Sequence, residues 1–410
     1  MTDDLWNTLT QAFPWSRAPF DPPAAYGDLR REQPVVRVTT RNGEPVWLVT
    51  RYDDVRAILS DPRVSADSVA PGFPYLGEHR PEKAAPELRS FQEMDPPKHT
   101  IFRRILAKHF LVKNIESLRP QIQALVDERV DRMLQTSERP VDLVRELALP
   151  VPSTVLAWIL GVRPQDHEFF SSTTEEMMRS ASNGGPEGQQ IAFEAMKKLY
   201  GYISQLVEER SAAGVTGDDI IGHLIEAAKR DEITAQDVIN TGFLLLVAGH
   251  ETTASMIALG TLTLLQHPEQ LAELRAKPEL LPMAIEELLR YLTIVHLIVR
   301  RVAKEDIAVG GQIIPAGEGI IPLNFSANRD DAHYPDAATF NIHRRARDHF
   351  AFGSGIHQCI GQPLARVELQ VVYETLLRRV PTLRLAVPIE AVPFKLPAFI
   401  HGVEALPVTW

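Results

Sequence analysis

The segment FAFGSGIHQCIG, residues 350–361, carries Cys359, the only cysteine of the chain, between glycines. Glycine lacks a Cβ, so it allows positive φ and a close approach of the backbone to a ligand. A metal-bound thiolate needs backbone N–H donors near its sulfur. A helical pattern follows from Pro363, which should place the sulfur near a helix N-terminus, where a thiolate is favoured. The segment therefore indicates a metal-binding thiolate. A structural turn and a catalytic thiol with a histidine base are the alternatives.

The composition limits the classes of protein to consider. The chain has 410 residues, of which 44% are hydrophobic and 23% charged, as in a typical globular protein. Its net charge of −10 argues against nucleic-acid binding, which needs clustered Lys and Arg. One cysteine excludes an internal disulfide and a multi-cysteine zinc or iron–sulfur site. The acidic start, Met1–Asp4, lacks the features of a secretory signal, so we expect a cytoplasmic protein without a membrane anchor.

The order of helical and strand patterns predicts a mainly α fold with a smaller β-containing region. Apolar residues alternate on both sides of Asn42-Gly43, a dipeptide typical of hairpin turns. We expect one domain over residues 1–410. Its helix-rich core should cover about 98–300 and 364–380, and its β-containing portions about 34–50, 297–325 and 385–410. Residues 66–92 lack a clear period and predict a long loop, and long loops are often functional.

The apolar stretch Thr241–Leu265 is long enough to suggest a membrane span. However, it has the polar residues 250–253 at its middle, where an unpaired acid in lipid would be costly. Thr234 and Asp237 have the spacing of a capping box, and His267-Pro268 marks an end. These signals predict a helix of roughly 33 residues, about 50 Å long, crossing a globular core.

Within that helix, the segment AGHETT, residues 248–253, combines a glycine with adjacent polar side chains. Gly249 costs about 1 kcal/mol relative to alanine in a helix interior, and threonines can divert hydrogen bonds from the helix ladder. Such a site could kink and make room for a small ligand. An acid beside a hydroxyl could also relay protons. A polar notch filled by water is the alternative.

Two further pairs have helical spacing. Glu287 and Arg290 are three residues apart and can pair on one face, although most such pairs are solvated and of small value. His99 and Arg103 are four residues apart and would suit an anionic group such as a carboxylate. Ordinary surface charge at a helix N-terminus is the alternative for the second pair.

Together, and in this order, the four segments resemble the cytochrome P450 superfamily of haem-thiolate monooxygenases, closest to soluble actinobacterial members. The resemblance covers nearly the whole chain. The family pattern F-x-x-G-x-x-x-C-x-G is matched at every fixed position, by Phe352, Gly355, Cys359 and Gly361. The resemblance implies the P450 fold, a triangular prism with a long central helix over the haem. It also implies haem b as the cofactor and Cys359 as the ligand of its iron.

The resemblance also implies roles for other residues. Glu251 and Thr252 would be the acid–alcohol pair that delivers protons to dioxygen. Glu287 and Arg290 would belong to a buried structural network, whose third member should lie near His343 or Arg344 but is not identified by the sequence. The residues expected to hold the haem are His99, Arg103, Arg301 and His357 at its propionates, with Ala248, Phe352, Gly353 and Gly361 beside it.

The activity implied is the insertion of one atom of dioxygen into a hydrophobic small molecule, with C–H hydroxylation as the default outcome. A terpenoid, steroid or polyketide-like substrate would suit the mainly apolar segments that face the distal pocket in relatives. His296 is the polar exception, and it could bond substrate or be a turn or surface histidine. The residues expected to line the pocket are Leu244, Val247, Val295, His296, Ile298, Phe399 and Ile400.

Electrons should come from separate proteins, because the chain has no room for a fused flavin or ferredoxin domain and no G-x-G-x-x-G after a strand. We expect a ferredoxin and an NAD(P)H-dependent reductase, with Arg104, Lys108 and Lys113 as a basic docking face. A nitric oxide reductase of the same fold is one alternative, and residues 317–330 resemble that branch too. Glu251 argues against it and against a peroxide-using relative. A non-catalytic haem sensor is a third alternative, and it would not need the acid–alcohol pair.

Overall fold

The computed structural model describes residues 11, 13–15, 17–76, 89–183, 185–214, 217–395 and 399–410, which form two compact units. Unit 1 comprises Met1–His99, Glu286–Cys359 and Leu396–His401, and unit 2 comprises Thr100–Ile285, Ile360–Lys395 and Gly402–Trp410. Each unit therefore combines segments that are far apart in the sequence.

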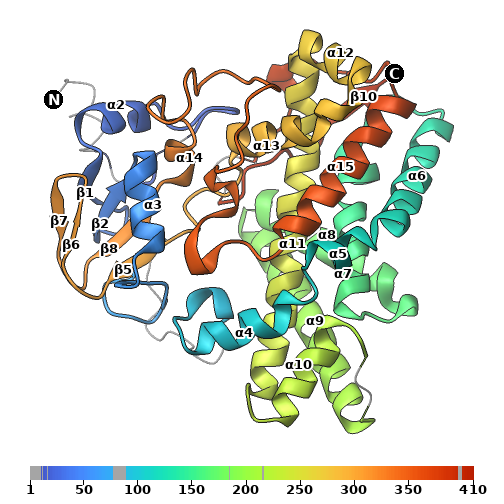
Figure 1. Ribbon diagram of the computed structural model, residues 1–410. Helices are drawn as coiled ribbons and strands as arrows, with labels where there is room; N and C mark the ends of the chain where they lie inside the picture. The colour runs from blue at the N-terminus through green and yellow to red at the C-terminus, as the bar shows by residue number, and fades with distance from the viewer. Residues whose placement is uncertain are drawn as a thin grey trace. The chain divides into compact units, whose positions relative to one another are not determined.

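Unit 1 is built on a five-stranded sheet of order β1-β2-β8-β5-β3. The first two strands are antiparallel and turn at Gly43, whose φ of +84° suits the predicted Asn-Gly hairpin. Helix α3 (Tyr52–Ser60) buries Val55, Ile58 and Leu59 in a core with Ile320 of β8 (Figure 1). The strands are β1 (Val35–Thr39), β2 (Pro45–Val49), β3 (Val64–Ser65), β5 (Arg301–Ala303) and β8 (Gly319–Pro322), with a separate hairpin of β6 (Ile307–Val309) and β7 (Gln312–Ile314).

Short helices fill the rest of unit 1. A 3-10 helix, η2 (Phe91–Glu93), starts at a capping box between Ser90 and Glu93. The other short elements are α2 (Ala25–Glu32), α14 (Asn324–Ala327) and the 3-10 helices η6 (Phe350–Phe352) and η7 (Gly355–His357).

Unit 2 is organised around α11 (Ala235–Gln266), which packs against α7, α9, α10 and α15 (Figure 1). Thr234 and Asp237 form the predicted capping box at its start. The most apolar 18-residue window of α11 meets the length and hydropathy of a membrane span, yet 61% of it is buried inside the protein. The long apolar stretch is therefore a core helix.

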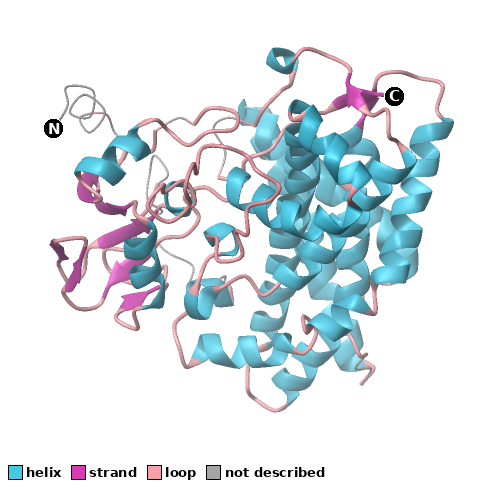
Figure 2. Ribbon diagram, turned by 45° about the horizontal axis from the view of Figure 1, so that its top comes forward, coloured by secondary structure: helices cyan, strands magenta, loops and turns pink. Residues whose placement is uncertain are grey.

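Helices also make up most of the rest of unit 2, and its few strands are short (Figure 2). The divisions of the sequence at 99/100 and 285/286 fall within α4 and α13. The helices are α4 (Lys98–Ala107), α5 (Val112–Glu116), α6 (Arg119–Gln135), a π-helix η3 (Val144–Ala148), α7 (Pro150–Leu160), η4 (Pro164–Asp166), α8 (His167–Asn183), α9 (Gly185–Ala212), α10 (Ile220–Lys229), α12 (Pro268–Ala276), η5 (Pro278–Leu280), α13 (Leu281–Leu292), α15 (Gln362–Arg379) and η8 (Ile389–Ala391). The strands are β4 (Val141–Asp142), β9 (Arg384–Leu385) and β10 (Pro407–Thr409), in the order β4-β10-β9.

The mainly α fold with a smaller β-containing region is confirmed, and most expected elements form where their patterns lie. The sequence did not reveal β3 and β4, because two residues are too few to show an alternating pattern. Part of the predicted loop 66–92 lies outside the described residues.

Candidate functional site

The cysteine segment is a loop of tight turns that presents its sulfur outward. The amide of Cys359 donates a hydrogen bond to the carbonyl of Phe352 at 2.9 Å, and the thiol is exposed. Gly355 has a φ of +72°, and a Cβ there would collide with the backbone oxygen of Leu59 on α3. Helix α15 begins at Gln362, three residues after the cysteine. The loop geometry therefore explains this glycine and agrees with the expected N-terminal setting of the sulfur.

Unit 1, which carries Cys359, also contains basic and imidazole side chains that the sequence predicted as site residues. The ring centroids of His99 and His357 lie 4.2 Å apart, and His99 is only 2% exposed. Arg301, on β5, donates to the carbonyl of Arg300 at 2.7 Å. Burial lowers the pKa of Arg301 to about 10, and the charge of Asp95 acts in the opposite direction. Arg301 therefore remains a cation at neutral pH.

The residues present fit a haem group. A thiolate is a known axial ligand of haem iron, and imidazole and guanidinium groups are suitable donors to propionate carboxylates. Gly353 has a φ of +67°, and a Cβ there would meet nothing within 4 Å, so the backbone of this loop has an open face. Arg103 is partly buried on α4, one turn after His99, as the spacing predicted. Gly361 is the N-cap residue of α15.

A partly uncovered stripe runs along the otherwise buried helix α11. Its neighbours Leu245, Leu246, His250 and Thr253 are buried. The residues of this stripe have the spacing of one helical face, and they are the α11 residues that the sequence analysis predicted as site residues. Its members are Leu244, Val247, Ala248, Glu251 and Thr252, of which Ala248 is exposed and the others are partly exposed.

The acid and the alcohol on this stripe have different partners. The hydroxyl of Thr252 donates to the carbonyl of Ala248 at 2.7 Å, so it bonds to the preceding turn of its own helix. The carboxylate of Glu251 pairs with Lys395 at 3.3 Å, and the two side chains are 15% and 9% exposed. Helical structure continues through Gly249, where a Cβ would lie 2.9 Å from Leu156 on α7. Close helix packing explains this glycine.

The sequence analysis missed Lys395. Its amide donates to the carbonyl of Gly402 at 2.9 Å, and Phe394 forms a β-bridge with Val403. A Cβ at Gly402 would lie 2.6 Å from the hydroxyl oxygen of Ser255, one turn beyond Glu251 on α11. The C-terminal segment thus packs on α11 where its lysine reaches the acid. No signal in the sequence connects residues 144 positions apart.

Glu287 and Arg290 form a buried network with Arg344. Both side chains of the pair are 0% exposed, and their atoms approach to 2.7 Å. The guanidinium of Arg290 also donates to the carbonyls of Asn328 and Ala337, at 2.6 and 2.9 Å. Arg344 Nε lies 3.2 Å from Glu287 Oε1, which identifies the third member. The surface-pair alternative is excluded, since burying these charges would be costly without such partners.

The residues expected to line a substrate pocket are divided between the units: Leu244 and Val247 are on α11 of unit 2, and the other five occupy varied settings in unit 1. Val295 and Ile400 form a β-bridge, while Ile298 and Phe399 are 38% and 53% exposed. Residues 77–88 of the expected loop lie outside the described residues.

His296 is a buried residue rather than a surface one. Its ring accepts or donates a 2.8 Å hydrogen bond with the hydroxyl of Tyr26, and it is 6% exposed. Burial and the charge of Arg17 lower its pKa to about 3, so it is neutral.

Comparisons with known proteins agree on one family. The family model described as cytochrome P450 matches residues 21–382. The chain is 47% identical to cytochrome P450-SU2 of Streptomyces griseolus over 97% of this chain and 96% of the relative. It is 42% identical to the mycinamicin VIII C21 methyl hydroxylase of Micromonospora griseorubida, over 95% of this chain and 96% of the relative. The crystal structure of GfsF matches with a TM-score of 0.89 and 45% identity, over 97% of this chain and 100% of that one.

Proposed function

Because the chain belongs to the cytochrome P450 family, we propose that it uses haem b, held by Cys359, to hydroxylate a hydrophobic small molecule. It is a P450 monooxygenase, as its hydroxylase relatives indicate. The observation that carries the proposal is the exposed thiol of Cys359 in a loop that matches the family pattern at every fixed position. When bound, haem supplies a thiolate-ligated iron that activates dioxygen.

The loop that carries Cys359 has the first role, which is to hold the thiol in place. The amide of Cys359 is already bonded within the loop, which fixes the direction of the side chain. Imidazole and guanidinium donors from His99, His357, Arg301 and Arg103 would hold the haem by its two carboxylates. Charge-assisted hydrogen bonds of this kind are about twice as strong as neutral ones.

Glu251 and Thr252 supply protons during dioxygen reduction. The Glu251 carboxylate is held by the Lys395 ammonium at the edge of the uncovered stripe. The Thr252 hydroxyl donates its hydrogen bond to the Ala248 carbonyl, so the lone pairs of its oxygen can accept a hydrogen bond from water. The carboxyl group of Glu251 releases a proton to a water that the Thr252 oxygen positions by accepting its hydrogen bond, and this water passes a proton on to the site of dioxygen reduction, which is general acid catalysis by positioned groups.

The substrate is a hydrophobic molecule of terpenoid, steroid or polyketide type. Leu244 and Val247 give the stripe of α11 an apolar part, and Ile298 and Phe399 are exposed apolar side chains of unit 1. One relative is named for hydroxylating a methyl carbon of mycinamicin VIII, and its structure is described as bound to that compound. Incubation with candidate substrates under isotopically labelled dioxygen tests this assignment. We expect one labelled oxygen atom in the product, and label only in water would contradict it.

Electrons come from a separate ferredoxin and its NAD(P)H-dependent reductase in the cytoplasm. We assign the docking face to Arg104, Lys108 and Lys113, which are exposed basic residues, although Arg104 also pairs with Glu232. Changing Arg104 and Lys108 to glutamate should weaken ferredoxin-driven turnover while peroxide-driven turnover survives. Equal loss of both activities would refute docking at this face.

The alternatives predict different measurements. A nitric oxide reductase would consume nitric oxide with NAD(P)H and need no dioxygen, and a peroxide-using enzyme would not need reductant. A haem sensor would show no substrate-dependent oxygen consumption. Substrate-dependent oxygen uptake, with NAD(P)H consumed in equal amount, separates the proposed activity from all three.

A further inference from the structure

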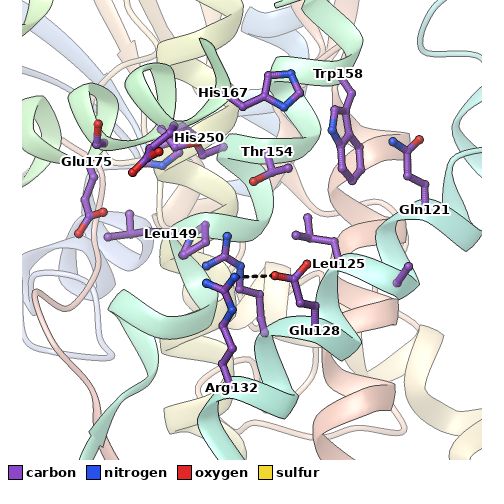
Figure 3. A pocket seen from close by; sticks show the side chains of 17 residues that line it. Gln121, Leu125, Glu128, Arg132, Leu149, Thr154, Trp158, His167, Glu175 and His250 are labelled. Carbon is purple, nitrogen blue, oxygen red and sulfur yellow. Dashed lines mark hydrogen bonds and ion pairs between the residues drawn. The ribbon is translucent and has the colours of Figure 1, made fainter. Parts of the chain in front are cut away.

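A cavity in unit 2 is one place where a hydrophobic ligand could bind. It has a volume of about 800 Å³ and lies among α6, α7 and α8, with His250 of α11 in its lining (Figure 3). Its side chains pair with one another, since Arg132 lies 2.8 Å from Glu128 and Ser153 donates to Ser171 at 2.9 Å. Acids and bases are mixed in this lining, so it favours no single class of ligand.

Unit 1 instead contains a short ribbon that presents apolar side chains. The ribbon consists of residues 294–296 and 399–401, which are joined by an antiparallel bridge between Val295 and Ile400. Phe399 is 53% exposed, and Val295 and Ile400 are partly exposed. Two backbone hydrogen bonds of 2.7 Å flank the bridge, from the amide of His296 to the carbonyl of Phe399 and from the amide of His401 to the carbonyl of Ile294.

The first strand of the ribbon is flanked by residues in a strained backbone conformation. Thr293 and Leu297 have φ values of +35° and +66°, which are rare for residues with a side chain. Such residues persist only where the surrounding contacts hold them, and they are frequent at functional sites. Asn328 donates to the hydroxyl of Thr293 at 2.8 Å, and Leu297 packs against the core that contains Tyr26. Contacts outside the ribbon therefore determine its conformation.

The N-terminal segment 17–26 contacts both strands of the ribbon. The hydroxyl of Tyr26 and Nε2 of His296 lie 2.8 Å apart, and the two residues are 0% and 6% exposed. On the other strand, Nε2 of His401 donates to the carbonyl of Pro19. Two side-chain hydrogen bonds thus connect this segment with the ribbon, one to each strand.

The hydrogen bond between Tyr26 and His296 joins two uncharged groups. Burial lowers the pKa of His296 to about 3, and the charge of Arg17 acts in the same direction. Burial raises the pKa of the Tyr26 hydroxyl far above its ordinary value. Neither group therefore titrates near neutral pH, and the hydrogen bond persists there.

We propose that Tyr26 and His296 are positioning residues that determine substrate specificity. Their hydrogen bond holds the ribbon in the strained conformation in which its apolar side chains receive a hydrophobic substrate. Both residues are buried, so they act through the ribbon and do not touch the substrate themselves. This inference rests on the proposed function, since it concerns the substrate of the monooxygenase.

Hydrogen exchange, followed by mass spectrometry of the holoenzyme, tests whether Tyr26 holds the ribbon. Tyr26→Phe removes only the hydroxyl. The matched control is Tyr373→Phe in unit 2, because Tyr373 is 1% exposed and its hydroxyl donates to the carbonyl of Met256 at 2.6 Å. We expect peptides that cover 293–298 and 399–402 to exchange about tenfold faster in Tyr26→Phe, since a buried polar group without its partner is costly. Exchange as slow as in Tyr373→Phe would overturn the proposal.

Binding of imidazole and clotrimazole tests whether the held ribbon selects ligands. Both compounds ligate haem iron, but only clotrimazole adds large apolar rings, so the ratio of their dissociation constants reports the apolar contacts. The shift of the Soret band measures both constants. We expect Tyr26→Phe to weaken clotrimazole by up to about tenfold and to leave imidazole unchanged, because the apparent dissociation constant rises as the competent fraction falls. Tyr373→Phe should leave the ratio unchanged.

Substitutions of His296 provide a rescue test. His296→Leu should resemble Tyr26→Phe in both measurements. His296→Gln should remain close to the wild type, because a glutamine side chain has both donors and acceptors for the Tyr26 hydroxyl. Equal behaviour of the leucine and glutamine variants would contradict a role for the hydrogen bond.

Two further variants distinguish the ribbon from the cavity. Val295→Ala shortens a side chain of the ribbon, and Ser172→Trp fills the mouth of the cavity in unit 2. An unchanged ratio in Tyr26→Phe overturns the proposal, whether Val295→Ala or Ser172→Trp changes it instead. A protein that binds no haem would show that the proposed function had failed, and hydrogen exchange would still report whether Tyr26 holds the ribbon.

Discussion

Truncation of Arg344 should destabilise the protein measurably without unfolding it. The Arg344→Ala variant loses the 3.2 Å contact with Glu287 and bonds to the carbonyls of Pro335 and Asp336, at 2.7 and 3.0 Å. A hydrogen bond to a charged group is worth about 1.5–3 kcal/mol, and breaking a fully buried ion pair costs about 3–5 kcal/mol. Because Glu287 keeps Arg290, we expect a loss of about 2–3 kcal/mol in the free energy of unfolding.

Urea unfolding, followed by circular dichroism, measures this loss as a lower midpoint at an unchanged m value. The matched control is Lys197→Ala, since the Lys197–Glu194 pair spans 3.4 Å with side chains 56% and 50% exposed. Exposed pairs contribute about 0–1 kcal/mol, so the control should remain close to the wild type. If Arg344→Ala were as stable as Lys197→Ala, the network would not have the structural role assigned to it.

Three further changes follow from the structure. Thr252→Ala should keep haem and dioxygen binding but divert electrons to peroxide, which peroxide and product assays measure together; a fully coupled variant would contradict its role. Lys395→Met should cost about 1–2 kcal/mol, because it leaves Glu251 partly buried without its cation, and a double-mutant cycle with Glu251→Gln should show coupling rather than additivity. Burial raises the pKa of Glu368 to about 8, so its folded state keeps a proton that the unfolded state loses near pH 4.5. Stability should therefore fall by roughly 1.4 kcal/mol per pH unit between these values, and Glu368→Gln should remove that slope in urea titrations at several pH values.

Local patterns explain why much of the fold was predictable. The Asn42-Gly43 turn and the capping box at Thr234 each depend on residues close together in the chain, and both form as expected. The glycine at 355 is explained by its own φ and by the nearby backbone of Leu59. In contrast, β4 (Val141–Asp142) depends on pairing with β10, which its two residues do not reveal.

Residues recruited from distant segments were not predictable. Arg344 and Glu287 are 57 positions apart, so sequence spacing gave only the region of the third network member. Lys395 reaches Glu251 across 144 positions. His250 is named by the helix motif, but its burial and its place at the end of a cavity depend on how α7 and α8 pack beside α11.

The central claim is that Cys359 holds a haem iron as its thiolate. The absorption spectrum of the dithionite-reduced protein under carbon monoxide tests this claim, with Cys359→Ala as the matched variant. We predict a strongly red-shifted Soret band in the wild type and its loss in the variant. A Soret band at the position of a histidine-ligated haem, or no haem in folded wild-type protein, would contradict the assignment.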